Sequence, residues 1–565
     1  MRLVTLALSV AALAAAAEAQ SPAPLVEPFR PNRTPLAATA EVPGGFELFV
    51  ADPVSQALFN PARLGLSTRR GRRGRQGEPP AGRFVYGTVR PSAAVPAPAV
   101  DPWATPAAYP FPNTGAVFVP SRRTLYTPNA VAVAAAFGSD ALRWVVTAEH
   151  QALLDRHDRD RALDIQEDAP SFRSEDSGTE DLDYHEARAR VAAVGRAGAV
   201  GYSVGVFGGY RFAHREVSSF SLSREDRYPE MPLPEYSRSE RERTTEQEGF
   251  DEAFGVGAEF GVASKRLDLV GTLSFQRRRA RGTYLSDRFE RSESASQFPD
   301  SLFVRRLVRD EDERGRTGFE ANAFDGSLFT ALYVGDGPEA DAFTLEAFGT
   351  VGGGAATSVA STLYLNQYFE GSEGALELVQ EDRTAFDGAA SSLDPDGYHV
   401  GGALGYVHRR RFGRTAVVAG ARLAAAGGRR RDAVAPGAIA DYLYPRYPFQ
   451  AVVEDAQADF FAATATLPLH AEAPVAGPFR LFGGGVFSYD LAYAKGRYDL
   501  RRGVTSPEVV EVQETYREEG RRFESDGRFY LGTRLRTKSG LAAQAAFRGS
   551  LSSFGGWTVS LGYHF

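Results

Sequence analysis

One segment of the chain matches a catalytic pattern, because Gly201-Tyr-Ser-Val-Gly205 has the spacing G-x-S-x-G. In hydrolases with this motif the serine stands on a sharp turn between a strand and a helix, within reach of a histidine. Here Ser203 lies inside a segment that alternates apolar and polar residues, which favours the polar face of a strand. His185 lies on the preceding segment of this kind. A hydrolase is kept as an alternative, but we expect no enzyme and no catalytic residue.

Charged and metal-binding residue types indicate no further site. Residues 68–77 carry five arginines in a glycine-rich stretch, which suits a phosphate, another anionic partner or a solvated loop. Two acidic runs, 155–160 and 310–313, lack the glycine and the distant glutamate of a calcium loop. The eight histidines are scattered, with no H-E-x-x-H pair. We therefore predict no metal and no cofactor.

The composition excludes several classes of protein. Among 565 residues, 64 Lys and Arg against 71 Asp and Glu give a net charge of −7, so there is no electrostatic footprint for nucleic acid. The absence of cysteine excludes a disulfide framework, a thiolate metal site and a cysteine nucleophile. Glycine (58), phenylalanine (38) and tyrosine (23) beside only two methionines argue against a helical protein.

The N-terminus has the features of a secretory signal peptide. Met1-Arg2 is followed by the apolar run 3–17 and by the small-x-small site Ala17-Glu-Ala19. We therefore expect a signal peptide over 1–19 and a proline-rich periplasmic tether over 20–43. No run of 18 apolar residues follows, so we expect no transmembrane helix. A closed β-barrel is still compatible with this observation, because strands that cross a membrane need only alternating apolar and polar residues.

The C-terminus reads as a strand with a strict period of two. In residues 557–565 the apolar side chains Trp557, Val559, Leu561, Tyr563 and Phe565 share one face, and polar or small ones share the other. This segment resembles the terminal strand of bacterial outer-membrane β-barrels. That resemblance implies that Trp557, Tyr563 and Phe565 form an assembly signal for the barrel assembly machinery. The alternative is the last strand of a soluble β-sandwich.

The same alternation recurs throughout the rest of the chain. Counting back from Phe565, the pattern predicts 15 strands, over 129–138, 141–151, 184–196, 198–213, 249–263, 266–282, 317–334, 341–358, 398–410, 415–427, 456–469, 479–494, 525–537, 540–550 and 557–565. A barrel with both ends on one side needs an even number of strands. Either residues 83–90 supply one more or one of these is lost, so we predict about 14–16 strands.

The connections separate a membrane barrel from a soluble sandwich. Short turns alternate with long polar segments, which we expect as loops over 154–183, 215–248, 283–314, 366–397, 428–455 and 495–524. Outer-membrane barrels have short periplasmic turns and long extracellular loops. In a soluble sandwich, nothing requires short and long connections to alternate along the chain. Several predicted strands are longer than the ~9–11 residues that cross a bilayer, so we expect them to extend beyond it.

The region before the barrel, 44–128, does not follow the alternation. Within the segment 51–65, Val54, Leu58 and the following Asn-Pro turn of Asn60-Pro-Ala62 read as one short helix that is stopped by Pro61. This helix and motif resemble the hatch of outer-membrane transporters for fatty acids and aromatic hydrocarbons, the FadL type. The resemblance implies that Asn60, Pro61 and Ala62 belong to a plug inside the barrel. The chain departs from the family at Arg63, where a glycine is usual, and in the long tether.

These observations predict an all-β protein, a transmembrane antiparallel outer-membrane β-barrel over 129–565 with an N-terminal plug-like segment. The resemblance implies passive transport of a small hydrophobic compound across the outer membrane of a Gram-negative-type bacterium. A barrel that does not transport, and acts in secretion or surface attachment, is the first alternative. The expected partners are outer-membrane lipid, lipopolysaccharide and the barrel assembly machinery, with no nucleic acid.

Overall fold

A computed structural model describes most of the predicted barrel and part of the region before it. The described residues are 46–49, 53–66, 83–90, 93–94, 126–127, 129–139, 141–165, 171–227, 236–298, 301–335, 339–372, 375–434, 451–505, 509–537, 539–550 and 554–564. The predicted signal peptide, the tether, the arginine-rich stretch 68–77 and Phe565 lie outside these residues. Predictions about them therefore remain predictions.

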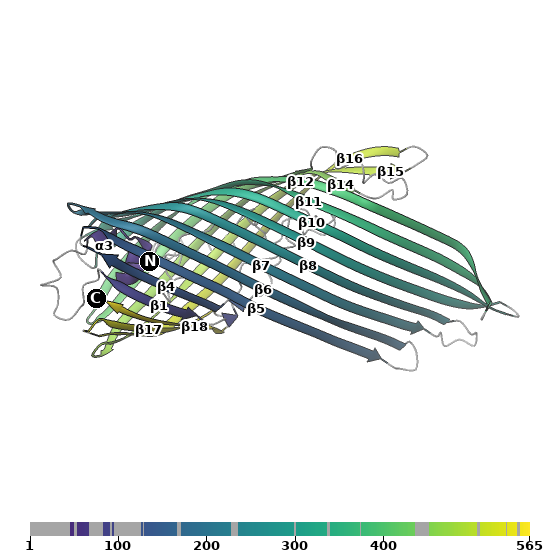
Figure 1. The fold of residues 1–565 in the computed structure, drawn as a ribbon, viewed down its shortest axis with the longest axis horizontal. Helices are drawn as coiled ribbons and strands as arrows, with labels where there is room; N and C mark the ends of the chain where they lie inside the picture. The colour runs from purple at the N-terminus through teal and green to yellow at the C-terminus, as the bar shows by residue number, and fades with distance from the viewer. Residues whose placement is uncertain are drawn as a thin grey trace.

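The described strands form one closed antiparallel barrel of sixteen strands (Figure 1). They are β1 (Phe84–Arg90), β4 (Asn129–Gly138), β5 (Arg143–Ile165), β6 (Ser171–Ala197), β7 (Val200–Arg227), β8 (Tyr236–Ala263), β9 (Leu267–Phe298), β10 (Ser301–Val334), β11 (Asp341–Ser372), β12 (Ala375–Phe412), β13 (Thr415–Val434), β14 (Ala451–Ala476), β15 (Phe479–Thr505), β16 (Val509–Arg536), β17 (Leu541–Ser550) and β18 (Phe554–His564). Strand β1 pairs with both β4 and β18, so the optional segment 83–90 supplies the closing strand. A separate two-stranded sheet joins β2 (Ala93–Ala94) and β3 (Tyr126–Thr127).

The short turns lie where the sequence places them. Gly198 and Gly413, in the turns before β7 and β13, have φ of 60° and 61°. Glycine adopts this left-handed conformation without the steric cost that a Cβ atom would bring. At these two turns the chain reverses within two or three residues, and the two flanking strands pair from the turn onward.

The prediction of long polar loops is wrong for most of their length, because these segments continue as strands. Strands β9 and β10 pair from Leu267↔Leu332 to Phe298↔Ser301 without a register shift. Once a hairpin is in register, each added pair satisfies two more backbone groups, and polar cross-strand pairs stabilise the ladder. The sequence did not reveal this because strands that are wet on both faces lack an apolar face to detect.

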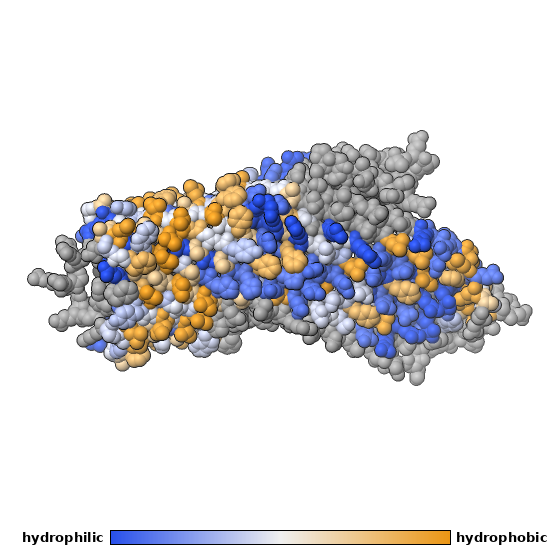
Figure 2. All heavy atoms as spheres, viewed as in Figure 1, coloured by the Kyte–Doolittle hydropathy of each residue, from blue (hydrophilic) through white to orange (hydrophobic). Residues whose placement is uncertain are grey.

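The outer face of the barrel carries an apolar belt of the height that a membrane requires. On β10 the outward residues Phe324, Leu328, Leu332 and Val334 are 40–62% exposed. Phe324 and Val334 are ten residues apart, about 33 Å along a strand and about 25 Å along the axis at a tilt of about 40°. Figure 2 shows the matching apolar band around the end that carries the short turns. The chain is therefore a transmembrane β-barrel.

Aromatic side chains mark both borders of this belt. Those near the short turns are Trp144, Tyr202, Phe260, Phe343, Phe479 and Tyr563, and those at the far border are Tyr210, Phe254, Phe324, Tyr398, Phe461 and Tyr489. Aromatic girdles at both interfaces are typical of outer-membrane barrels. Among the described residues, no helix has the length and apolar content that a membrane crossing would need.

The wall has two very different heights beyond the belt. Strands β5 to β16 have 20–38 residues, but β1, β4, β17 and β18 have only 7–11. Strand β4 pairs with β5 only as far as Asn129↔Ala152, and β17 pairs with β16 only from Ser550↔Arg528. In the described part of the chain, the tall extension is therefore open on the side of the four short strands (Figure 1).

Three short helical elements before β1 lie inside the barrel. They are η1 (Phe46–Leu48), α2 (Pro53–Phe59) and α3 (Arg63–Leu66), and together we call them the hatch. They lie at the end of the barrel where the short turns are found and where β18 ends (Figure 1). Phe46, Leu48 and Leu58 are 0–2% exposed, which places the hatch in the core of the molecule.

Candidate functional site: the hatch and the barrel wall

The sequence of α2 explains both its ends. Pro53 occupies the first helical position, where the missing N–H is not needed. Val54, Ala57 and Leu58 lie on one face at helical spacing and are at most 2% exposed. Pro61 lacks the N–H that would continue the helix, which ends at Phe59. The helix therefore carries Asn60 to the wall at a fixed position.

Asn60 holds the turn that follows α2 and binds the wall at the same time. Its Oδ1 accepts from the backbone N–H of Ala62 at 3.2 Å. Its Nδ2 donates to the carbonyl oxygen of Val262 at 3.1 Å and to Oδ1 of Asp268 at 2.8 Å. Asn60 is 0% exposed, so each of these bonds is made away from water. The structure thus brings the predicted plug residues against β8 and β9, while their role stays a prediction.

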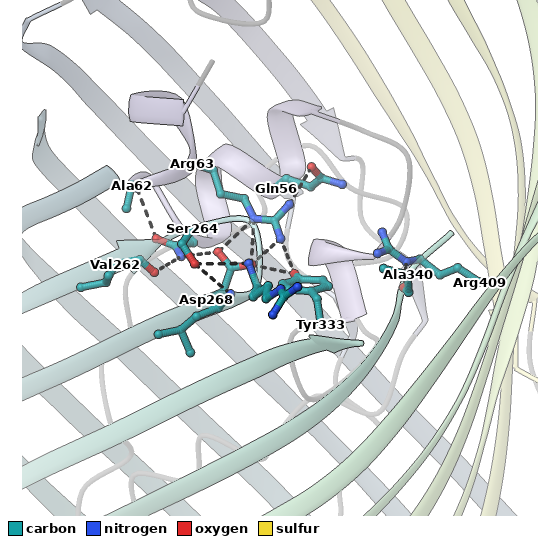
Figure 3. A network of polar contacts seen from close by, with 12 residues as sticks. Gln56, Ala62, Arg63, Val262, Ser264, Asp268, Tyr333, Ala340 and Arg409 are labelled. Carbon is teal, nitrogen blue, oxygen red and sulfur yellow. Dashed lines mark hydrogen bonds and ion pairs between the residues drawn. The ribbon is translucent and has the colours of Figure 1, made fainter. Parts of the chain in front are cut away.

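Arg63, the departure from the family pattern, forms the main ion pair of the hatch (Figure 3). Its Nε lies 3.0 Å from each carboxylate oxygen of Asp268, and its Nη2 also contacts Asp268 and the hydroxyl of Tyr333. The Tyr333 hydroxyl donates to Asp268 at 2.6 Å, and Arg63 Nη1 donates to Gln56 at 3.1 Å. The Asp268 side chain is 0% exposed. Breaking such a buried pair on one side costs about 3–5 kcal/mol.

Two further arginines on the wall bind carbonyl groups of the hatch. Arg190, on β6, donates to the carbonyl oxygen of Leu58 and pairs with Glu259 at 2.6 Å. Arg143, on β5, donates to the carbonyl oxygen of Leu64. Carbonyl groups at the end of a helix lack intrahelical partners, and cationic side chains satisfy them well. The polar contacts that hold the hatch therefore come from the part of the wall between β5 and β10.

The backbone of the hatch lies unusually close to the wall at two glycines. A Cβ atom added to Gly201 would lie 2.0 Å from the carbonyl oxygen of Ala62. A Cβ atom on Gly261 would lie 2.6 Å from Oδ1 of Asn60. Neither glycine has a positive φ among those observed, so it is the close approach that requires them. Glycine permits this approach because it has no side chain.

Apolar side chains complete the contact around the remaining circumference. Phe59 meets Phe329 edge to face at 5.1 Å, and Phe49 lies 6.0 Å from Tyr333. Two buried clusters join the hatch to the wall, one through β9–β13 and β15–β17 and the other through β1, β4–β6 and β17. Helix α3 contacts β6, β7 and β8. The hatch therefore packs against most of the strands of the wall.

The structure separates the two residues of the hydrolase alternative. Ser203 is buried on the lumen face of β7, opposite Val194, next to Asn60. His185 pairs with Phe212, nine residues further along β7, or about 30 Å. It stacks on His150 at 5.5 Å, on the face that points away from the lumen. A proton transfer between them has no route, and Ser203 instead packs beneath the hatch.

The C-terminal strand carries its predicted residues on the outer face. Trp557 and Tyr563 are 57% and 48% exposed in the apolar belt. Strand β18 pairs with β17 and β1, and its His564 ring nitrogen Nε2 lies 2.5 Å from the Tyr86 hydroxyl. Recognition of these residues by an assembly machinery stays a prediction.

Sequence reasoning missed Asp268, Tyr333, Arg190 and Arg143, the wall residues that bind the hatch. Each lies at least 79 positions from its hatch partner. The signal that pointed to them is weak: a polar residue in a strand, near the end of that strand that adjoins a short turn. Among the described residues, no group of three or more histidine or acidic side chains is placed to hold a metal ion.

The fold and the site define a transmembrane β-barrel of the outer-membrane type with an N-terminal hatch. No family model and no curated protein matches the chain. Among solved structures, a Pseudomonas aeruginosa FadL homologue is 12% identical, with coverage of 92% of this chain and 96% of that one and a TM-score of 0.23. It belongs to the family that the Asn-Pro-Ala segment resembles.

Two other solved structures are similar at the same level. The P. putida toluene transporter TodX is 10% identical, with coverage of 90% and 92% and a TM-score of 0.19. The FrpB iron transporter from Neisseria meningitidis is 8% identical, with coverage of 85% and 80% and a TM-score of 0.17. Identities and TM-scores this low carry no argument about function, which must come from the site itself.

Proposed function

We propose that the barrel lets a small compound cross the outer membrane of a Gram-negative-type bacterium passively, and that the hatch gates its lumen. The observation that carries this proposal is the ion pair between Arg63 of the hatch and Asp268 of the wall. A sixteen-stranded barrel is wide enough for an aqueous channel when nothing fills it. In this chain the hatch lies inside the barrel, and its polar bonds to the wall hold it in one docked position.

The class of compound follows from the resemblance, which implies a hydrophobic solute. The lumen wall beyond the hatch has apolar as well as polar side chains, and its rings Phe207 and Phe319 are almost fully covered by neighbouring residues. It also carries ion pairs, such as Asp251 with Arg278 at 2.6 Å. We therefore propose a solute with an apolar body, and uptake of labelled aromatic compounds against sugars of equal size tests this part.

Arg63→Ala tests the gate directly. The substitution leaves the buried Asp268 carboxylate without its ion-pair partner, and the lost stabilisation of about 3–5 kcal/mol corresponds to a shift of about 100-fold or more in the docked fraction. We expect conductance across planar bilayers to rise to that of a wide open pore. Deletion of 44–66 should give the same open conductance without preventing barrel assembly.

Arg196→Ala is the matched control, because Arg196 lies at the same end and, within the described residues, its side chain hydrogen-bonds only the turn carbonyl of Gly198. The double variant Arg63→Ala with Asp268→Ala should be less leaky than Arg63→Ala alone, because it removes the unpaired charge as well. If all of these proteins conducted alike, and uptake did not depend on the hatch, the non-transporting alternative would replace this proposal.

A further inference from the structure

The lipid-facing side of the wall has a groove at the far border of the apolar belt, next to the tall extension. The groove has a volume of 680 Å³ and lies across strands β8 to β12. Its floor is the place where Gly326 on β10 lies directly opposite Gly349 on β11, because neither residue has a side chain to fill the space. A volume of about 300–1,000 Å³ is typical of small-molecule sites. The groove can therefore hold part of a ligand.

Apolar side chains line this groove. Leu273 and Phe275 on β9 line one side, and Val351 on β11 and Tyr398 on β12 line the other. Phe324, between them on β10, has its ring 5.2 Å from that of Phe275. Leu273, Phe324, Val351 and Tyr398 are 49–69% exposed, so the groove opens toward the membrane. A hydrocarbon chain is the group that such a surface takes up most readily from a bilayer.

Donor side chains lie directly above the groove, at the level of lipid headgroups. Arg277 is two residues beyond Phe275 on β9, about 7 Å along the strand and about 5 Å along the axis at a tilt of about 40°. Headgroups occupy about 5–8 Å beyond the hydrocarbon on each side. Asn322 lies directly opposite Arg277 on β10, and Gly353 continues this row on β11. The row therefore offers guanidinium and amide N–H groups, which suit a phosphate.

The arginines keep donors for a ligand although a carboxylate lies beside them. Glu320 on β10 lies 3.0 Å from Nη2 of Arg277 and 3.0 Å from Nε of Arg279. Each guanidinium has five N–H donors, and its contact with Glu320 engages one of them. The two arginine side chains are 35% and 45% exposed. A phosphate that approaches from the membrane can therefore accept hydrogen bonds from both.

The net charge of this surface is close to zero, so the donors and the groove decide the ligand. Over the four register rows from Arg277 to Thr283, the outer faces of β8 to β11 carry four arginines and three glutamates, +4 − 3 = +1. Glu216 on β7 and Asp396 on β12 flank these rows. A free anion would gain little here from charge alone. An anion that is attached to a hydrocarbon chain gains from both the groove and the donors.

We propose that the groove holds one acyl chain of lipopolysaccharide, and that Arg277, Arg279 and Asn322 bind a phosphate group of the same molecule. The tall extension lies outside the cell, so the groove belongs to the outer leaflet, and lipopolysaccharide is a lipid of that leaflet with phosphate groups close to its acyl chains. The bound chain fills the gap that Gly326 and Gly349 leave in the belt. This site is on the outside of the wall and does not depend on the gating proposed for the hatch.

Native mass spectrometry of the full chain in detergent, after incubation with bisphosphorylated lipid A, tests the proposal. We expect one lipid A molecule to stay bound to each barrel. Gly349→Leu places a side chain on the floor of the groove, where a Cβ atom would meet Cγ1 of Val400 at 3.3 Å, and should weaken binding about tenfold. Arg277→Gln should also weaken it about tenfold, because the phosphate loses a charged donor.

Each variant has a matched control. Gly87→Leu adds the same side chain to the lipid-facing side of β1, where a Cβ atom meets nothing within 4 Å, and should retain the lipid. Arg521→Gln removes an arginine from the outer face of β16, where its Cζ lies 5.7 Å from the centre of the Tyr493 ring, and should retain it too. Dephosphorylated lipid A should bind more weakly, and Arg277→Gln should not weaken it further. Arg63→Ala should leave lipid binding unchanged while it alters conductance.

Several results would overturn the assignment. Absence of bound lipid A, or equal losses in Gly349→Leu and Gly87→Leu, would show that the groove is not the site. Equal binding of phosphorylated and dephosphorylated lipid A would exclude the phosphate contact, and a protein dimer that Gly349→Leu abolishes would place a second copy of the chain in the groove. Heat-modifiable migration checks that each variant forms the barrel. If Gly349→Leu does not, Gly326→Leu replaces it, because its Cβ atom would meet only the flexible end of Leu273 closely, at 3.2 Å.

Discussion

Asp268 accepts hydrogen bonds from three side chains, which come from two other parts of the chain. Asn60 and Arg63 belong to the hatch and Tyr333 to β10, whereas Asp268 opens β9. A buried carboxylate is stable only when such partners are present. The charge on Asp268 therefore commits the hatch to one docked position, and the same charge penalises any position in which Arg63 is withdrawn.

Gly201→Val tests the close approach of the hatch without touching any charge. A Cβ atom at this position would overlap the Ala62 carbonyl oxygen at 2.0 Å, and that oxygen belongs to backbone that cannot rotate away. We expect the hatch to be displaced, so that its bonds to Asp268 are lost and conductance rises as in Arg63→Ala. Limited proteolysis should then cleave the chain within the hatch, at sites protected in the unchanged protein.

Gly87→Val is the corresponding control on β1. A Cβ atom at Gly87 meets nothing within 4 Å, so valine is expected to face the lipid without strain. A protein in which Gly201→Val stays closed and protease-resistant would show that the hatch can shift by the width of a side chain. The account of a tightly fitted hatch would then be wrong.

The residues of this site show what one sequence can and cannot reveal. Asn60-Pro-Ala62 is local, so its helix stop and its resemblance could be read directly. Asp268 and Tyr333 could not be found, because pairing them with Arg63 requires the barrel to bring together residues 205 and 270 positions apart. The alternation of apolar and polar residues placed Asp268 on a polar face of its strand. It does not distinguish a lumen position exposed to water from one covered by the hatch.

At the scale of elements, closure of the barrel depends on its shortest strand. Strand β1 pairs antiparallel to both β4 and β18, so these two neighbours run parallel to each other. The sequence predicted 83–90 only as an option, because a strand this short has too few residues for its alternation to stand out. The even number of strands was the physical argument in its favour. The long hairpins, in contrast, were hidden by their polar composition.

Deletion of 84–90 should therefore prevent closure of the barrel. Strands β4 and β18 cannot form antiparallel pairs with one another, so fifteen strands would leave two open edges in the membrane. Each unpaired backbone group in hydrocarbon costs several kcal/mol. We expect the variant to lose heat-modifiable migration, while Tyr86→Phe, which removes the hydroxyl contact with His564, retains it. Normal folding of the deletion variant would contradict the strand order described above.

At the scale of the whole molecule, one barrel contains three environments that differ in what surrounds each strand. The belt faces lipid, the hatch lies in a dry core, and the extension stands in water on both faces. This arrangement explains a mean hydropathy of −0.28 in a membrane protein, because polar residues on the lumen face and in the extension outweigh the belt. The opening above four short strands also makes the extension a one-sided wall with an accessible inner face.

The absence of cysteine allows these environments to be mapped one residue at a time. Single cysteines at Val204 in the belt, Ser294 in the extension and Ala57 in the hatch would be the only thiols in the chain. With intact cells, we expect a membrane-impermeant maleimide to label Ser294→Cys quickly and to leave Val204→Cys unlabelled, because lipid covers it. Ala57→Cys should be unreactive in the unchanged protein and reactive when combined with Arg63→Ala, because release of the hatch exposes it. Rapid labelling of Val204→Cys would instead place the belt in water, and the membrane assignment would fail with it.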